Sequence, residues 1–227
     1  VTVHGAKNPG MMLINNPWGE SNEKGLTAAL AAANLPTAGI ERVEANDIDV
    51  VPQLTRLKDA GADAIFMVAN VGPSAQVMKS LERMAWDVPV VSHWGPAGGR
   101  FSELAGPRAA DVEMIQTFTF SGNDSPVAAE KLEALKAMFP EIQSAADVTP
   151  AVGIANAYDA MHLTALAIKN AGSLEGPAIR QGYYDIGTHE GLIKTYETPF
   201  TPDNQDALGP EDYVFTRFID GEIIPIE

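Results

Sequence analysis

The first half of the chain alternates short apolar segments with segments whose apolar residues recur at helical spacing. The apolar segments have the length and near-continuous character of buried strands, and the segments between them have the period of amphipathic helices. This alternation predicts right-handed βαβ units and therefore an α/β fold, in which helices cover both faces of a parallel sheet. The predicted strands are 11–15, 39–44, 64–69, 88–92 and 112–120, and the predicted helices are 21–33, 50–60 and 72–84.

The second half is mainly helical and then turns to strands. Helices are predicted at 126–139, 152–171 and 176–182, and strands at 192–197, 213–219 and 222–226. Asp220-Gly221 predicts a hairpin turn between the last two strands. The helix over 152–171 carries apolar residues on several faces, so we expect it to be buried on more than one side. Either the helices of 121–208 cover the first-half sheet, or they pack on a sheet that this chain does not contain.

Charge and residue types narrow the function. Lys and Arg number 15 against 30 Asp and Glu, which gives a net charge of −15. This charge opposes nucleic acid and anionic membranes, and no apolar run is long enough for a membrane span, so neither nucleic-acid binding nor membrane insertion is predicted. The chain has no cysteine and its histidines are scattered, so no metal site, cofactor or catalytic triad is predicted. No nucleophile-elbow or zinc-protease motif occurs, so an enzyme is the less favoured class.

Candidate ligand contacts follow the predicted strands. Ligands of open parallel sheets bind beyond the carboxyl ends of the strands, and aromatic side chains with a few polar groups suit a small-molecule site. Each candidate also has a structural alternative: the tryptophans could close the sheet end, the histidine could be structural, the asparagine at 70 could cap a helix, and the valine could end a strand. The candidates after the first, third and fourth strands are Asn16, Trp18, Asn70, Val71, His93 and Trp94.

Two further candidates lie outside these three positions. Arg100 ends the glycine-rich run 95–100, which lacks the spacing of a phosphate-binding loop and instead indicates close backbone approach. Its guanidinium is a candidate partner for a ligand carboxylate, and a surface role is the alternative. Tyr158 lies on the predicted helix 152–171, where core packing is the alternative to ligand contact.

Several motifs, in order along the chain, resemble one family. They are GAKNPGMMLINNPWGE at 5–20, DAIFMV at 63–68, VPVVSHWG at 88–95, AYDA at 157–160, AIKNAG at 167–172 and FIDGEIIP at 218–225. Together they are similar to type I periplasmic solute-binding proteins of ABC importers, the branched-chain amino acid (Leu/Ile/Val) receptor family. The resemblance covers essentially the whole chain. It implies two α/β lobes joined by three crossing strands, with the ligand held in the cleft between them.

The resemblance also implies a domain organisation. Residues 1–118 and 211–227 correspond to the second lobe, and residues 119–210 to the returning segment of the first lobe. Family members carry a signal peptide and a first half-lobe before the point at which this chain begins. We therefore expect the chain to be part of a longer protein whose first half-lobe supplies the sheet for the helices of 121–208.

The function implied by the resemblance is that of a periplasmic substrate-binding protein. It would close around a small molecule by hinge motion, dock on a membrane permease and perform no catalysis. Related amino-acid receptors place an acidic residue near the loop that corresponds to 93–99. In this chain the first Asp or Glu after His93 is Glu103. The expected ligand is therefore amino-acid-like or an aromatic or carboxylate metabolite. The alternatives are a ligand-sensing domain of the same fold in a regulator or receptor, and an α/β enzyme.

Overall fold

The chain forms two compact units. The structure is a computed structural model that describes residues 4–226. Unit 1 comprises Val1–Ile115 and Phe215–Glu227, and unit 2 comprises Gln116–Val214. These boundaries fall within a few residues of the lobe boundaries expected at 118/119 and 210/211; residues 1–3 and 227, the outer ends of the expected second lobe, lie outside the described residues. The assignment of the two units to lobes stays a prediction.

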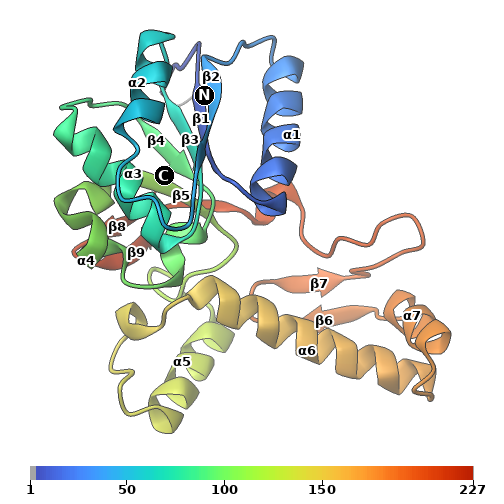
Figure 1. The fold of residues 1–227 in the computed structure, drawn as a ribbon. Coiled ribbons are helices and arrows are strands. Elements are labelled where there is room, and N and C mark those ends of the chain that lie inside the picture. The colour runs from blue at the N-terminus through green and yellow to red at the C-terminus, as the bar shows by residue number, and fades with distance from the viewer. Residues whose placement is uncertain (1–3, 227) are drawn as a thin grey trace. The chain divides into compact units, whose positions relative to one another are not determined.

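Unit 1 is built on a seven-stranded sheet of order β2-β1-β3-β4-β5-β8-β9 (Figure 1). The first five strands run parallel, and β8 and β9 pair antiparallel at one edge. This confirms the predicted α/β class and its mostly parallel sheet. The strands are β1 (Gly10–Ile14), β2 (Gly39–Val43), β3 (Ile65–Val68), β4 (Val90–Ser92), β5 (Val112–Gln116), β8 (Val214–Ile219) and β9 (Glu222–Pro225).

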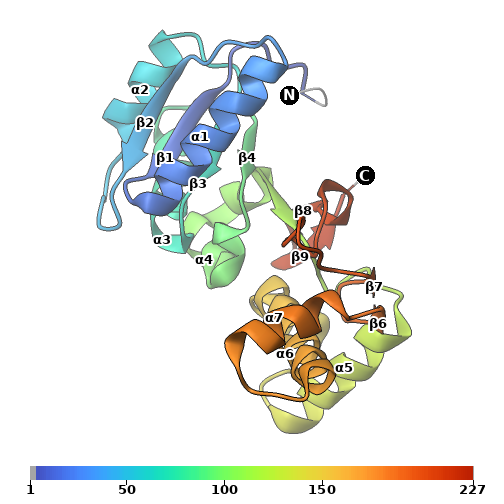
Figure 2. The same ribbon diagram turned by 90° about the vertical axis from the view of Figure 1, so that its right-hand side faces the viewer.

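Helices cover both faces of this sheet (Figure 2). Successive side chains of β1 point to opposite faces, and all of them are buried. Met12 and Ile14 join the core beneath α2 and α3, whereas Met11 and Leu13 join the core beneath α1. The helices are α1 (Pro17–Ala32), α2 (Val51–Asp59), α3 (Val71–Arg83) and α4 (Phe101–Ala105).

Two element boundaries differ from the sequence prediction for local reasons. The first helix begins at Pro17 rather than at residue 21, because the Asn16 side chain accepts a hydrogen bond of 3.1 Å from the Gly19 N–H and caps it. The strand predicted over 112–120 ends at Gln116. Beyond it the chain enters unit 2, where Phe118 and Phe120 pack edge to face at 4.8 Å in a separate core.

Unit 2 is helical with one small sheet. Its long helix α6 packs with its neighbours around two separate apolar clusters. The strand predicted over 192–197 is present but shorter, over Thr195–Glu197, and pairs antiparallel with Thr188–Glu190 in a hairpin. The elements are α5 (Pro126–Met138), α6 (Ala151–Ala171), α7 (Gly176–Tyr184), β6 (Thr188–Glu190) and β7 (Thr195–Glu197).

The prediction that the helix over 152–171 is buried on more than one side is wrong for the described residues. Its buried positions form one stripe at helical spacing, from Val152 through Asp159 to Ala167. The stripe faces α5, α7, the hairpin and the segment that carries Phe200 and Leu208 (Figure 1). Met161 on another face is 71% exposed.

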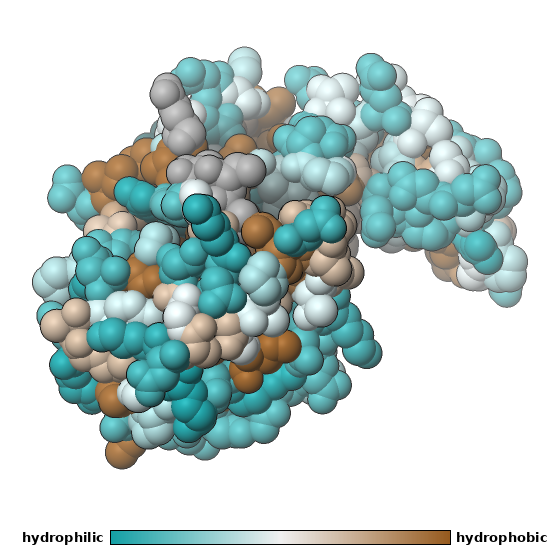
Figure 3. All heavy atoms as spheres, turned by 90° about the horizontal axis from the view of Figure 1, so that it is seen from above, coloured by the Kyte–Doolittle hydropathy of each residue, from teal (hydrophilic) through white to brown (hydrophobic). Residues whose placement is uncertain are grey.

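The surface agrees with the acidic composition. The face seen in Figure 3 is mostly hydrophilic, with smaller apolar patches between the polar side chains. Within residues 4–226, none of the helices combines the length and apolar character that crossing a bilayer requires. The same residues contain no group of three or more His, Cys, Asp or Glu side chains arranged to hold a metal ion.

A buried carboxylate fastens the antiparallel edge of the sheet in unit 1. Glu113 of β5 is only 7% exposed. It accepts a hydrogen bond of 2.8 Å from Nε2 of His4 and another from the guanidinium of Arg217 on β8. Burial alone would raise the pKa of Glu113, but the bonds from His4 and Arg217 outweigh burial, and the pKa lies below its usual value. The charged form is therefore the one that the fold stabilises.

We expect Glu113→Gln to lower the free energy of unfolding by about 1–3 kcal/mol near neutral pH, because it leaves Arg217 without its buried anion. The depressed pKa means that the stabilisation is present above the pKa of the unfolded carboxyl, about 4.3, and is lost as the pH falls through the folded-state value. Urea unfolding near pH 7 and below about pH 4 should therefore show a difference that narrows in acid. Glu82→Gln, at an exposed position, is the matched control; a difference independent of pH would contradict the account.

Candidate functional site

The loops that follow β1, β3 and β4 meet at the carboxyl edge of the sheet in unit 1. These strands are adjacent in the order β1-β3-β4 and parallel, so their carboxyl ends lie side by side. The ring of His93 lies between two indoles: its centroid is 5.3 Å from that of Trp18 and 4.5 Å from that of Trp94, both edge to face. We call these three side chains the aromatic cluster. The structure thus brings together three of the residues selected from the sequence.

Close backbone approach holds the cluster together. A Cβ atom at Gly95 would lie 2.1 Å from the carbonyl oxygen of Ala69 and 3.2 Å from the Trp18 ring, so only glycine fits there. The same carbonyl accepts a hydrogen bond of 3.0 Å from the Ser74 hydroxyl, which fixes the end of β3. The predicted close approach of the glycine-rich run is therefore confirmed at Gly95.

The two asparagines at this edge differ in whether their side chains already make a capping hydrogen bond. The side-chain oxygen of Asn16 is used in capping α1. Asn70 stands at the equivalent position before α3, but its exposed side chain makes no capping hydrogen bond. Its amide therefore retains donors and an acceptor for a ligand. Val71, the first residue of α3, is half-buried and packs against the main core of unit 1.

His93 is held in its neutral form. Burial lowers the pKa of its imidazole below the ordinary value. The Nδ1 atom is buried and has no hydrogen-bond partner among the described residues. Near neutral pH the aromatic cluster therefore carries no charge, and its polar capacity lies in the imidazole and the nearby Asn70 amide.

Arg100 and Tyr158 have other surroundings. The exposed guanidinium of Arg100 pairs with Glu103 one helical turn away, and this hydrogen bond raises the pKa of Arg100. Tyr158 belongs to unit 2, where its ring stacks 4.3 Å from His162 and lies 5.5 Å from the Lys131 ammonium. Tyr158 also packs against a core cluster of that unit.

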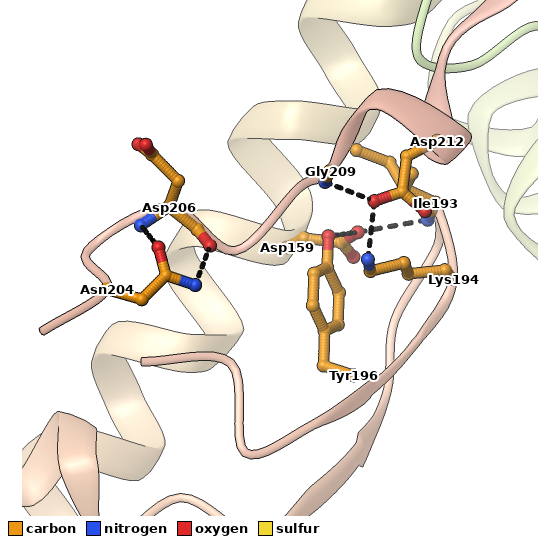
Figure 4. Close-up of polar contacts among 8 residues, drawn as sticks. All are labelled: Asp159, Ile193, Lys194, Tyr196, Asn204, Asp206, Gly209 and Asp212. Atoms are coloured by element: carbon orange, nitrogen blue, oxygen red, sulfur yellow. Dashed lines mark hydrogen bonds and ion pairs between the residues drawn. The ribbon is translucent and has the colours of Figure 1, made fainter. Parts of the chain in front are cut away.

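A buried carboxylate of unit 2 was not selected from the sequence. Asp159 on α6 is 2% exposed. It accepts a hydrogen bond of 2.6 Å from the backbone N–H of Leu192. It also accepts from the Ile193 N–H at 2.9 Å and from the Tyr196 hydroxyl at 2.8 Å (Figure 4). Burial, followed by the bond to Asp159, raises the pKa of Tyr196 well above its usual value. The single carboxylate thus fastens the β6–β7 hairpin to the helix.

The same part of unit 2 contains two open hollows. One, of about 570 Å³, lies between β7 and the segment 204–211. Its wall includes Lys194, which pairs with Asp212 at 2.5 Å, while the Gly209 N–H donates to the same carboxylate at 2.7 Å (Figure 4). The second, of about 440 Å³, is lined by Asp159, Tyr196 and neighbouring residues. Asp159, Lys194 and Asp212 on these walls already have partners within the unit.

Comparison with known proteins defines the family. Residues 1–221 match the family model described as periplasmic binding protein. The chain belongs to the periplasmic binding protein family. Comparison with curated proteins finds no significant match.

Solved structures share the type I fold of this periplasmic binding protein. A type 1 periplasmic binding protein from Bordetella pertussis Tohama I is 19% identical, with a TM-score of 0.83 over 98% of this chain and 62% of that one. A putative branched-chain amino acid ABC transporter protein from Rhodospirillum rubrum is 17% identical, with a TM-score of 0.78 over 99% of this chain and 62% of that one. LivJ from Streptococcus pneumoniae, in complex with isoleucine, is 22% identical, with a TM-score of 0.74 over 96% of this chain and 58% of that one. The periplasmic binding protein chain thus spans about three-fifths of the length of these structures.

In this periplasmic binding protein the His93 imidazole should titrate below about 6.5, the usual value for histidine. Removing one indole by Trp18→Ala should admit water and move the pKa of His93 upward. Since the folded pKa is depressed, His93 favours the folded state above about pH 6.5, and this contribution is lost as the pH falls through the folded value. An NMR titration of the imidazole measures both effects. Trp86→Phe, at a ring that lies under Lys58 elsewhere in unit 1, is the control and should leave the titration unchanged.

Removing the Asp159 carboxylate should destabilise unit 2. Asp159→Ala leaves two backbone N–H groups and the Tyr196 hydroxyl without their acceptor, and we expect a loss of about 3–5 kcal/mol. Hydrogen exchange should show lost protection at Leu192 and Ile193. Asp185→Asn, at an exposed carboxyl that accepts a hydrogen bond from the Gln181 side chain, should preserve this protection. Retained protection at both amides in Asp159→Ala would show that another group holds the hairpin.

Proposed function

We propose that this chain forms part of an extracytoplasmic substrate-binding protein of an ABC importer, that it binds a small amino-acid-like or aromatic/carboxylate metabolite, and that it performs no catalysis. The observation that carries the proposal is the convergence of Trp18, His93 and Trp94 at the carboxyl edge of the sheet. Membership of the periplasmic binding protein family supports a location outside the cytoplasm and a binding role.

The chemistry of this edge favours a ligand with an apolar or aromatic body. Edge-to-face aromatic side chains offer a large apolar contact area, and a neutral imidazole adds no charge that would have to be compensated. Asn70 supplies an uncommitted amide. The loop after β4 offers no carboxylate to hold an ammonium group, since its first acid after His93 is Glu103, which pairs with Arg100.

A carboxylate on the ligand is favoured by the helices that start at this edge. Both α1 and α3 begin directly after their strands, at Pro17 and Val71. The N-terminal turn of a helix carries partial positive charge and unpaired N–H groups, which suit an anion. The start of α3, which no side chain caps, therefore supports an aromatic or branched-chain carboxylate over an amine.

In this proposal, ligand binding shifts a population of open and closed forms. Unit 1 contributes the aromatic cluster, and a second lobe contributes the remaining contacts, among which Tyr158 is a candidate. A ligand that contacts both lobes favours the closed form by its differential affinity for the two states. The closed form would then be the one recognised by a membrane permease.

Tryptophan fluorescence offers a direct test, because two of the three tryptophans lie in the aromatic cluster. The natural polypeptide that carries this chain should be titrated with isoleucine, phenylalanine, phenylpyruvate and, as an amine without a carboxylate, phenethylamine. We expect a carboxylate of this panel to change the emission, and Trp18→Ala or Trp94→Ala to weaken its binding by about tenfold or more.

Trp86→Phe is the matched control for this test. It removes the third indole, which contacts Lys58 and the main core, and should leave both the affinity and the emission change intact. Wild-type affinity in Trp18→Ala and Trp94→Ala would show that the ligand binds elsewhere. A preference for phenethylamine would contradict the proposed carboxylate.

A further inference from the structure

Unit 2 contains a smaller hollow whose chemistry differs from that of the aromatic cluster. It has a volume of about 290 Å³ and lies among α6, α7 and the segment around Phe200. Helix α7 packs against the C-terminal part of α6 (Figure 1), where the Asn170 side-chain amide donates to the Gly182 carbonyl oxygen. Leu163 is buried in its wall, and the Tyr183 and Phe200 rings meet edge to face at 5.2 Å. The size is at the lower end for small-molecule sites.

The hydroxyl groups of the inner wall have no proton available to donate to a ligand. The Thr164 hydroxyl lies 2.6 Å from the Ala160 carbonyl oxygen and donates its only proton there. The Tyr183 hydroxyl lies 2.7 Å from the same Thr164 oxygen and must therefore be the donor in that pair. With both protons committed, the inner wall presents mainly carbon to the hollow.

The rim of the hollow, in contrast to its inner wall, is polar. The hydroxyl oxygen of Tyr184 accepts a hydrogen bond of 2.7 Å from Nε of Arg180 and one of 3.2 Å from the side-chain amide of Gln205. Both lone pairs of this oxygen are thus used, and its proton is left to donate. The bond from Arg180 also lowers the pKa of Tyr184, which makes the phenol a stronger donor.

Arg180 is exceptional among the arginines of the described part of the chain. Each of the others pairs with an Asp or Glu side chain, at positions 42, 56, 83, 100, 108 and 217. Arg180 has no carboxylate partner within residues 4–226, although the chain holds 30 acidic residues. Its terminal nitrogens, together with the Tyr184 hydroxyl, leave a cation and a neutral donor at the mouth of an apolar hollow.

We propose that this hollow is a binding site for a small monocarboxylate with an apolar body, of the size of benzoate or 3-methylbutanoate. The carboxylate accepts from the terminal nitrogens of Arg180 and from the Tyr184 hydroxyl, and the apolar body lies against Leu163 and Phe200. A planar guanidinium matches a carboxylate in a two-bond arrangement. One cation compensates one negative charge, so a phosphate dianion would keep an unpaired charge beside an apolar wall.

Titration of the natural polypeptide with benzoate tests the proposal. NMR of the Tyr183 and Phe200 rings should report one benzoate site in unit 2, and benzamide, which has the same body without the charge, should bind there at least tenfold more weakly. Arg180→Gln should weaken benzoate binding by about tenfold or more, and Tyr184→Phe by about threefold or more. Arg56→Gln, which removes an exposed arginine of unit 1, is the matched control and should leave binding unchanged.

The test separates this site from the aromatic cluster. All three tryptophans lie in unit 1. Trp18→Ala should therefore preserve the NMR response of Tyr183 and Phe200 to benzoate, whatever it does to ligands of the aromatic cluster.

Several results would overturn the proposal. They are ring signals of Tyr183 and Phe200 that do not respond to several millimolar benzoate, a response of these rings that survives Arg180→Gln, and benzamide that shifts these rings as well as benzoate does. Inorganic phosphate competing as strongly as benzoate would show a surface anion contact without recognition of the apolar body, and would overturn it as well.

Discussion

The parallel pairing of β1, β3 and β4 is the constraint on which the candidate site depends. Met11 pairs in register with Phe66, and Phe66 in turn with Val91, so each of the three strands ends within one residue of its neighbour. A slip of one residue would turn the core side chains of a strand to the opposite face. Because β1 is buried on both faces, either direction of slip is opposed by the core. The loops carrying Trp18 and His93 therefore inherit their positions from the packing of the sheet.

Close backbone contacts at two glycines fix the loops that follow these strands. A Cβ atom at Gly19 would lie 1.8 Å from the carbonyl oxygen of Ile14, so the first turn of α1 rests directly against the end of β1. Gly95 makes the corresponding approach to the end of β3. Neither glycine has a positive φ, so each is required for close approach and not for an unusual backbone conformation. The indole of Trp18 is thus placed by rigid backbone, which limits the entropy that a ligand must remove on binding.

The sequence predicts those elements whose formation depends on residues close together in the chain. The apolar runs mark the five parallel strands, and Asp220-Gly221 marks the hairpin, where the two residues adopt φ values of 52° and 85°. The start of α1 was misplaced because Ser21 and Asn16 both have capping side chains, and only packing decides between them. The post-strand rule finds the aromatic cluster, since strand ends are local features. It does not find the Asp159 contacts, whose partners lie 33 to 37 residues away, nor the pairing of Arg100 with Glu103.

The two carboxylates that are buried in the described part of this acidic chain, those of Glu113 and Asp159, are stabilised in the same way. Water solvates the carboxylates on the surface, but a carboxylate inside the fold is stable only where hydrogen-bond donors of the protein surround it. Glu113 meets this condition with His4 and Arg217, and Asp159 meets it with neutral donors from the β6–β7 hairpin. In unit 1 the buried acid adds a side-chain link from β5 to β8 and to His4, and in unit 2 it joins the β6–β7 hairpin to α6. The aromatic cluster, which has no such carboxylate, is left free of fixed charge and open to an anionic ligand.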